Sequence, residues 1–369
     1  MTTSRMRTEI AEQPAALRRT LDSLLSQVPD IAGLARDARQ VLFIARGSSD
    51  NAAVYGHYLT EVHTGRLATL ASPSIATTYK KRLDLTGVLA VAISQSGRTA
   101  EIVETLDWAG DCGARMIAIT NAADSPLAAV AELALITMAG DELAVPATKT
   151  YTTQLAALAV VGLGLAAADP TGPTVGAAVS PTGGRPGGPG IDAAELRRAP
   201  DEVDRLITAT ESSDALPAMV DELAEVTGVV VSGRGLAFGT ALELSLKLNE
   251  ACYLRAMGLS YADLLHGPIA VVDQSTPAIL AAADSGPTLP GTIALARRVT
   301  GAGARAYGVG GGPELAAACR HALPGPALAE WVAPLALVVP GQLLVEALAR
   351  KLGIDPDLPR GLRKVTQTD

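Results

Sequence analysis

Short runs of apolar residues alternate along the chain with longer stretches in which apolar residues recur at helical spacing. The short runs contain few polar residues, which is typical of parallel strands buried on both faces. The pattern predicts strands at 41–45, 88–93, 115–120, 133–138, 228–231, 278–282 and 304–309. It predicts helices at 6–26, 51–62, 100–109, 150–168 and 240–250. This alternation indicates an α/β fold in which helices flank parallel sheets.

The second half of the chain repeats the order of landmarks in the first half. Three landmarks recur at an offset of 188 to 190 residues, namely 45–47 with 233–235, 96–97 with 285–286, and 115–119 with 305–309. A nearly constant offset predicts a duplicated α/β domain. We expect a helical segment at 1–26, domains at 27–168 and 201–350, a Gly/Pro-rich linker at 169–200, and a C-terminal tail at 351–369.

Composition and charge argue against several classes of protein. The 369 residues are 48% hydrophobic with a net charge of −8, which fits neither a disordered chain nor a general nucleic-acid binder. The apolar run at 155–168 is shorter than the roughly 18 residues of a membrane span, and 1–10 lacks a signal-peptide core. The three cysteines form no CxxC pair and the histidines lack metal-ligand spacing. We therefore expect a soluble cytoplasmic protein without a metal site.

Three polar loops follow expected strands of the first half, at 46–49, 94–99 and 147–150. In a parallel sheet, ligands collect at the carboxyl ends of the strands, where Ser and Thr hydroxyls and free N–H groups bind anions. A single such loop would merely cap a helix, but three together favour a phosphate or sugar-phosphate site. Neither a GxxxxGK[ST] nor a GxGxxG motif is present, which disfavours nucleotide binding.

The second half contains a denser group of ionisable residues. Glu243, Lys247 and Glu250 are spaced i, i+4 and i+7 on one helix, and His266 follows 16 residues after Glu250. A solvated Glu–Lys pair is the alternative, but the leucines that flank these residues predict a buried helix. A carboxylate and a histidine suit proton transfer near neutral pH. The basic segment 359–366 could equally be a functional tail or an ordinary solvated end.

The chain contains six short sequence motifs, at 6–14 (MRTEIAEQP), 94–99 (SQSGRT), 148–155 (TKTYTTQL), 241–250 (ALELSLKLNE), 266–268 (HGP) and 359–364 (PRGLRK). With them the chain resembles the sugar isomerase (SIS) family. Within the family it is similar to the isomerase half of glucosamine-6-phosphate synthase and to stand-alone glucosamine-6-phosphate deaminases. The resemblance implies two tandem SIS domains, each a parallel sheet in a three-layer αβα arrangement. It also implies a homodimer and no cofactor.

The resemblance implies roles for individual residues. The phosphate and nearby sugar hydroxyls would be bound by Gly47, Ser48, Ser49, Ser94, Gln95, Ser96, Thr99, Val145 and Ala147. Glu250 would be the base that moves a proton between C1 and C2, with Lys247 contacting the open-chain sugar and Glu243 in the same catalytic set. His266 of a partner subunit would assist ring opening. Lys364 of the tail would lie near C1 or C2, where the equivalent lysine forms a Schiff base in some relatives.

Four positions depart from the family pattern and bear on the substrate. Arg98 replaces a glutamate, Ala147 a serine, Asn249 a lysine and Met257 an acidic residue. These changes leave proton transfer intact, but sugar discrimination depends on such hydroxyls and charges.

The function expected from the resemblance is an amino-sugar 6-phosphate isomerase and deaminase, which converts glucosamine 6-phosphate to fructose 6-phosphate and ammonia. The alternatives are a dehydratase of an N-acylated amino-sugar 6-phosphate, a sugar–amine phosphate deglycase, and a non-catalytic sugar-phosphate sensor. The full set of ionisable residues counts against the sensor. Thr2, and not a nucleophilic cysteine, follows Met1, so we expect no glutaminase activity from this chain.

Overall fold

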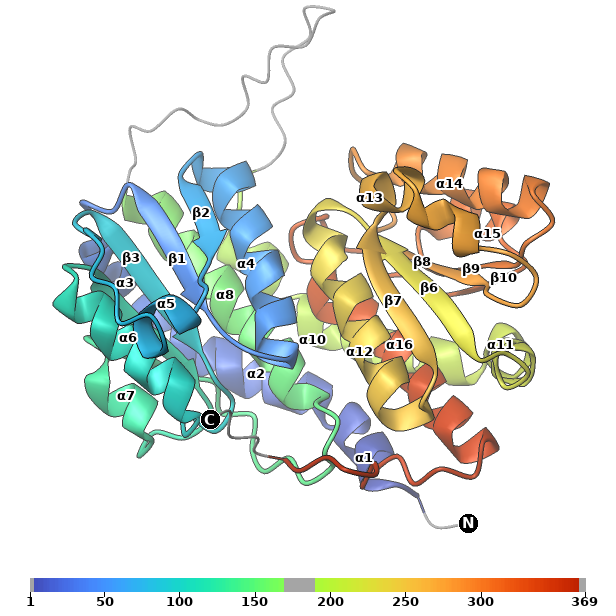
Figure 1. Ribbon diagram of the computed structural model, residues 1–369, viewed down its shortest axis with the longest axis horizontal. Coiled ribbons are helices and arrows are strands. Elements are labelled where there is room, and N and C mark those ends of the chain that lie inside the picture. Colours follow the sequence, from blue (N-terminus) through green and yellow to red (C-terminus); the bar gives the residue numbers. More distant parts are fainter. Residues whose placement is uncertain (1–2, 169–189, 365–369) are drawn as a thin grey trace, which may run out of the picture. The chain divides into compact units, whose positions relative to one another are not determined.

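The computed structural model describes residues 3–168 and 190–364. Their strands form two five-stranded parallel sheets with flanking helices (Figure 1), which confirms the predicted α/β class. The chain divides into two compact units, each built on one sheet. Within the described residues, the sheet-A unit comprises 18–138, 153–168 and 190–197, and the sheet-B unit comprises 3–17, 139–152 and 198–364.

Sheet A has the strand order β2-β1-β3-β4-β5, with all neighbouring strands parallel. Its strands are β1 (Gln40–Ile44), β2 (Leu67–Leu70), β3 (Val88–Ile93), β4 (Arg115–Thr120) and β5 (Leu133–Ile136). The helices associated with it are α2 (Gln13–Leu24), η1 (Leu25–Gln27), α3 (Val28–Leu34), α4 (Ser48–Thr64), α5 (Ser74–Thr77), α6 (Ala100–Asp111), α7 (Pro126–Val130), α8 (Lys149–Ala168) and α9 (Ala193–Leu196).

Helices cover both faces of sheet A. Successive side chains of each strand point to opposite faces and so pack against one helical layer or the other. On one face Ala90 of β3 packs in an apolar cluster with Leu106 of α6. On the other face Phe43 of β1 lies against α4. A Cβ on Gly56 of α4 would come within 3.1 Å of the Phe43 ring and 2.8 Å of Leu158 in α8. The central strand β3 is therefore buried on both faces, as its continuous apolar run predicted.

Helix α8 is the apolar helix that the sequence placed at 150–168. By length and composition it could cross a membrane, but 78% of its apolar window is buried inside the protein. A buried core helix accounts for this pattern, since its neighbours supply the apolar surroundings that a bilayer would otherwise provide.

Sheet B has the order β10-β9-β8-β6-β7, which is the topology of sheet A with each strand in the corresponding position. Its strands are β6 (Gly228–Gly233), β7 (Arg255–Ser260), β8 (Ala278–Ala282), β9 (Ala306–Gly310) and β10 (His321–Leu323). Its helices are α1 (Arg5–Ala11), α10 (Ala199–Glu211), α11 (Ala215–Leu223), η2 (Gly235–Ala237), α12 (Phe238–Cys252), α13 (Tyr261–Leu265), η3 (Pro268–Val271), α14 (Leu289–Gly301), α15 (Gly312–Ala318) and α16 (Pro334–Lys351). The repeated landmarks lie at the ends of β1 and β6, in the loops after β3 and β8, and along β4 and β9.

The prediction of one continuous helix over 6–26 was wrong. The chain forms α1 and then starts α2 at Gln13. Pro14 explains the break, because its ring cannot donate a backbone hydrogen bond and clashes inside a helix but is accepted in a first turn. The Gln13 side chain closes the junction by donating to the carbonyl of Ile10 at 3.1 Å.

The predicted linker at 169–200 lies mainly outside the described residues, since 169–189 are not described. Its last part contains helix α9 and the first residues of α10. Asp192 caps α9 by accepting from the backbone N–H groups of Ala194 and Glu195. The segment from 193 to 200 is therefore mainly helical, and the linker boundaries stay a prediction.

We expect Leu106→Ala to destabilise the sheet-A unit by about 2–5 kcal/mol, because Leu106 is fully buried and its loss leaves a cavity. The measurement is urea unfolding followed by circular dichroism. Leu83→Ala is the control, since Leu83 is 41% exposed and its truncation should change stability by roughly 0.5 kcal/mol or less. Equal effects of the two substitutions would contradict the assigned core.

Candidate functional site

The candidate residues divide between the two units. The loops that follow β1 and β3 belong to the sheet-A unit, whereas the loop 139–150, helix α12 and the C-terminal tail belong to the sheet-B unit.

The loop after β1 turns sharply into α4. Gly47 has φ 59° and forms the N-cap of α4, so no side chain of the N-cap residue bonds to the N–H groups of the first turn. Ser48 is half-buried and Ser49 is buried at this turn. Arg46 forms a bidentate ion pair with Glu101 in the first turn of α6. Its Nε lies 3.0 Å from Glu101 Oε2, and its Nη2 lies 3.1 Å from Glu101 Oε1. This pair ties the β1 loop to the element that follows the β3 loop.

The loop after β3 is ordered by its own serines. The Ser94 hydroxyl accepts from the backbone N–H of Gly97 and the Ser96 hydroxyl accepts from that of Arg98, each at 3.2 Å. Gly97 has φ 61°, and a Cβ there would overlap Ser125, so only glycine fits. Both hydroxyls still carry a proton that they can donate to a ligand.

Helix capping does not account for the polar residues of the β3 loop. Thr99 is the N-cap of α6 but makes no side-chain cap hydrogen bond. Gln95 and Ser96 are half-buried. Arg98, which replaces the family's glutamate, is exposed and pairs with Asp124 at 3.3 Å. The loop therefore presents hydroxyls and N–H groups in the form that suits an anionic group.

Helix α12 holds a buried row of charges. Lys247 is 1% exposed and Glu243 is fully buried, while the Glu250 side chain is 22% exposed. The Lys247 ammonium lies 2.5 Å from Glu250 Oε2 and 3.5 Å from Glu243 Oε1. The expectation of a buried rather than a solvated Glu–Lys pair is confirmed.

The charge of Lys247 is maintained by its neighbours. Burial alone would lower its pKa, but the carboxylates of Glu243, Glu250 and Glu142 outweigh this effect and raise it. The helix is buried because Leu244 packs against α16, where a Cβ on Gly341 would overlap its side chain. The apolar flanks that predicted burial thus place the lysine out of water.

The loop 139–150 is organised by Glu142, a residue that the sequence analysis missed. Its carboxylate is fully buried and accepts from the N–H and hydroxyl of Thr148 (2.8 and 3.2 Å) and of Thr150 (3.1 and 2.5 Å). Lys364 completes the set, with Nζ 2.6 Å from Glu142 and 2.8 Å from the carbonyl of Ala144. Burial would raise the pKa of Glu142, but Lys364 and these hydrogen bonds hold it below its usual value.

Helix α1 holds the same loop from another side. Buried Glu9 accepts from the backbone N–H groups of Leu143 and Ala144, and Glu12 pairs with Lys149, which is almost completely buried. Burial raises the pKa of Glu9 against these hydrogen bonds. These contacts give the motif at 6–14 a physical role, because its two glutamates anchor the loop that contains Val145 and half-buried Ala147.

The C-terminal tail is fixed by contacts of Asp357 and Arg360. The Asp357 carboxylate accepts from the N–H groups of Arg5 and Met6, both at 2.8 Å, and its carbonyl accepts from Val145 at 2.9 Å. The backbone N–H of Arg360 donates to the Tyr253 hydroxyl at 2.7 Å, and its guanidinium lies over the Tyr253 ring. The tail therefore lies on the loop 139–150, with Lys364 directed to Glu142.

Three other positions of interest lie outside this group of contacts. His266 ends α13 with an exposed side chain. Asn249 joins α12 to β7 by donating to the carbonyls of Ser245 and Ala256 at 2.9 and 3.0 Å. Met257 of β7 is 44% exposed. Among residues 3–168 and 190–364, no group of three or more His, Cys, Asp or Glu residues could hold a metal ion.

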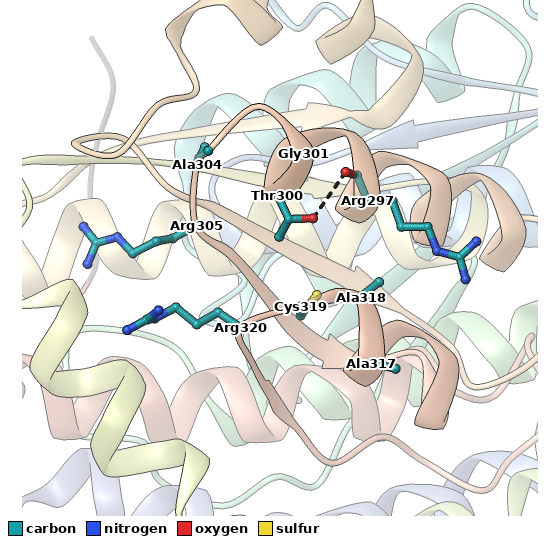
Figure 2. A pocket seen from close by; sticks show the side chains of 10 residues that line it. Arg297, Thr300, Gly301, Ala304, Arg305, Ala317, Ala318, Cys319 and Arg320 are labelled. Carbon is teal, nitrogen blue, oxygen red and sulfur yellow. Dashed lines mark hydrogen bonds between the residues drawn. The ribbon is translucent and has the colours of Figure 1, made fainter.

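A surface pocket of about 750 Å³ lies at the amino ends of β9 and β10 (Figure 2). Arg305 and Arg320 extend in the same direction there, whereas Arg297 points away from them. Glu222 already pairs with Arg320 at 2.7 Å and with Arg305 at 3.9 Å. The predicted site residues do not line this pocket, which sits at the opposite strand ends from those where α/β proteins bind ligands.

Comparisons with known proteins identify relatives of the chain. The model of the SIS domain family matches residues 34–163. The glutamine–fructose-6-phosphate aminotransferase (isomerizing) of Thermococcus kodakarensis is 31% identical over 358 residues, which are 96% of this chain and 56% of that protein. The chain therefore spans little more than half the length of this relative.

Two solved structures resemble the chain along almost its whole length. A candidate phosphosugar isomerase from Silicibacter pomeroyi DSS-3 is 32% identical with a TM-score of 0.81, covering 96% of this chain and 100% of that one. The C-terminal domain of glucosamine-fructose-6-phosphate aminotransferase from Francisella tularensis is 25% identical with a TM-score of 0.82, covering 97% and 99%.

We expect Lys247→Met to destabilise the sheet-B unit by about 3–5 kcal/mol, because it leaves the buried Glu243 without its cation. Since the pKa of Lys247 is raised in the folded protein, its stabilisation is fully present below the unfolded value of 10.5 and is lost as the pH rises through the folded value. The gap between wild type and variant should therefore be constant at neutral pH and narrow above 10.5.

Urea unfolding at a series of pH values measures this gap. Lys80→Met is the matched control, because Lys80 is 66% exposed and its pair with Glu104 should contribute about 1 kcal/mol or less. A Lys247→Met protein as stable as the Lys80→Met protein at pH 7 would contradict the assignment.

Proposed function

Because the chain belongs to the SIS (sugar isomerase) domain family, we propose that it is an enzyme that isomerises a sugar phosphate. More narrowly, we propose that it acts on an amino-sugar 6-phosphate and releases ammonia. Glucosamine 6-phosphate and water would be converted to fructose 6-phosphate and ammonia.

The observation that carries the proposal is the arrangement of Lys247 and Glu250. Of the two α12 carboxylates, Glu243 and Glu250, the latter is the more exposed. Glu250 accepts a hydrogen bond from the ammonium of Lys247, which is buried. A carboxylate that accepts a charge-assisted hydrogen bond is held in a fixed orientation, as a general base requires. In the proposed reaction Glu250 takes the proton from C2 of the open-chain sugar and returns it at C1. The resulting imine at C2 then adds water and loses ammonia.

The chemistry needs no cofactor in this scheme. The carbonyl at C1 makes the C2–H bond acidic enough for a positioned carboxylate, and the 2-amino group becomes the leaving group only after the proton has moved. The loops after β1 and β3 would bind the 6-phosphate through Ser48, Ser49, Ser94, Ser96 and Thr99. Their hydroxyls and backbone N–H groups support this assignment.

We also propose that the enzyme works as a homodimer in which His266 serves the site of the partner and assists ring opening. The exposed side chain of His266 at the end of α13 supports this. A histidine suits the step, because ring opening requires one group that both donates and accepts a proton near neutral pH.

The first test is a proton NMR time course in heavy water with glucosamine 6-phosphate, and N-acetylglucosamine 6-phosphate in a parallel sample. We expect fructose 6-phosphate and ammonia from the free amine. Glu250→Gln should slow the reaction about 100-fold to 10,000-fold, the contribution of a general base. Glu104→Gln, a change at an exposed glutamate of α6, is the control.

A Glu250→Gln protein with the wild-type rate would falsify the assigned base. Vinylic protons in the acylated sample alone would replace deamination by dehydration. Deuterium incorporation at C2 without ammonia would leave an isomerase of a different sugar phosphate.

The phosphate assignment has its own test. We expect Ser96→Ala to raise KM about 10-fold to 100-fold with kcat little changed, because a hydrogen bond to a charged group is lost both before and in the transition state. Steady-state kinetics with the phosphorylated sugar measure this change. An unchanged KM, or a loss confined to kcat, would contradict phosphate binding by this loop.

A further inference from the structure

Tyr253 ends helix α12 in a backbone conformation that tyrosine rarely adopts. It directly follows the last residue of the helix and has φ 54° and ψ 24°, in the left-handed region. Glycine is the usual residue at such a helix end, because a Cβ is strained there. A glycine would therefore end α12 with less strain than tyrosine does. A strained residue at this turn points to a use for its side chain.

The side chain of Tyr253 contacts the C-terminal tail. Its hydroxyl accepts a hydrogen bond from the backbone N–H of Arg360 at 2.7 Å. The central guanidinium carbon of Arg360 lies 4.3 Å from the centroid of the Tyr253 ring, in the geometry of a cation–π contact. One tyrosine thus holds both the backbone and the side chain of Arg360. The two contacts use different parts of the tyrosine, so mutation can remove them separately.

The tail has little apolar packing where it meets Tyr253. The residues at 360–363 are all exposed, and Leu362 is 42% exposed. A segment with few buried apolar contacts opens easily unless polar contacts hold it. Tyr253 supplies such contacts from the end of α12.

Arg360 lies in sequence between two other anchors of the tail. Asp357 accepts hydrogen bonds from the backbone of α1, and Lys364 donates to the loop that precedes α8. Tyr253 fixes the segment between them to α12. Glu250 lies in the last turn of this helix, next to the point where the tail is held.

We infer that Tyr253 is a positioning residue that joins the tail to the helix bearing Glu250, so that the placement of Lys364 relative to Glu250 depends on it. The inference rests on the proposed function, in which Glu250 is the base and Lys364 lies near C1 or C2 of the sugar. It holds for any chemical step in which Lys364 takes part. Groups that act on neighbouring atoms of one substrate must keep a precise mutual geometry, and a small misplacement costs rate.

The first experiment measures the hold on the tail without any substrate, by NMR hydrogen exchange of the Arg360 amide. In the wild-type protein we expect this amide to exchange more slowly than in an unstructured peptide. Tyr253→Phe keeps the ring but removes the acceptor, and should accelerate the exchange roughly twofold to tenfold, the factor for one lost hydrogen bond. Tyr253→Leu also removes the ring, and should accelerate it further. The Val230 amide, which donates to the carbonyl of Pro277 in sheet B, should exchange equally in all three proteins.

Tyr79→Phe is the matched control. It also removes a tyrosine hydroxyl, but Tyr79 is 75% exposed and belongs to the sheet-A unit, so exchange at Arg360 should not change. Equal exchange at Arg360 in the wild type and in Tyr253→Phe would overturn the inference. This comparison decides the question even if Tyr253→Leu does not fold.

The second experiment separates the inference from the proposed function, by steady-state kinetics with glucosamine 6-phosphate. We expect Tyr253→Leu to lower kcat about tenfold and to change KM less than about twofold, because the proposed phosphate contacts come from the loops after β1 and β3. Tyr253→Phe, which keeps the ring contact, should restore most of kcat.

Faster exchange at Arg360 with an unchanged kcat in Tyr253→Leu would overturn the positioning role and leave the function intact. A lower kcat with faster exchange at Val230 as well would also overturn it, because the whole unit would then be loosened. A wild-type protein without activity would overturn the proposed function, while exchange at Arg360 would still show whether Tyr253 holds the tail.

Discussion

The cost of removing charges from water governs the sheet-B unit. Lys247 and Glu142 are both fully buried, and neither is stable there without an opposite charge at hydrogen-bond distance. Lys247 finds its partners on its own helix. Glu142 finds its partner 222 residues away, in the tail. Much of the surrounding architecture follows from this requirement, since the loop, helix α1 and the tail are all held by hydrogen bonds around buried carboxylates.

The strands that the sequence predicted best are those buried on both faces. The bounds of β3, β4 and β8 agree with the predictions because their apolar runs are continuous and end at polar turns. Strands β2, β7 and β10 were missed. Their residues are largely exposed or half-buried, so they carry neither a continuous apolar run nor a strict alternation. Sheet edges are specified by pairing with a neighbour, which a local pattern does not contain.

The same distinction applies to the candidate site. The row on α12 was predictable because its members share one helix, and helical spacing alone places them on one face. Glu142 was not, because its partners are two nearby threonines and a distant lysine, and no periodicity links them. Arg98 illustrates a third case. Its identity marks a departure from the family, but only the structure shows that its charge is directed to Asp124 at the exposed rim of the loop.

The sheet-B unit is built from segments that are far apart in the sequence. This affects the order in which the parts of the chain can fold. Helix α1 is synthesised before the other described helices and strands, yet the backbone N–H of Met6 finds its acceptor in Asp357, about 351 residues later. The loop between β5 and α8 also depends on the tail, because Lys364 bonds to its residues Glu142 and Ala144. Sheet A is finished in sequence long before this, so it can form during synthesis, when N-terminal regions fold first. The last step in folding the sheet-B unit therefore brings together segments that are far apart in the sequence. Closing such long loops costs conformational entropy and is slow. If synthesis stalled before the tail, or the tail were cleaved off, sheet A would be complete. The sheet-B unit would lack the contacts that Asp357 and Lys364 supply.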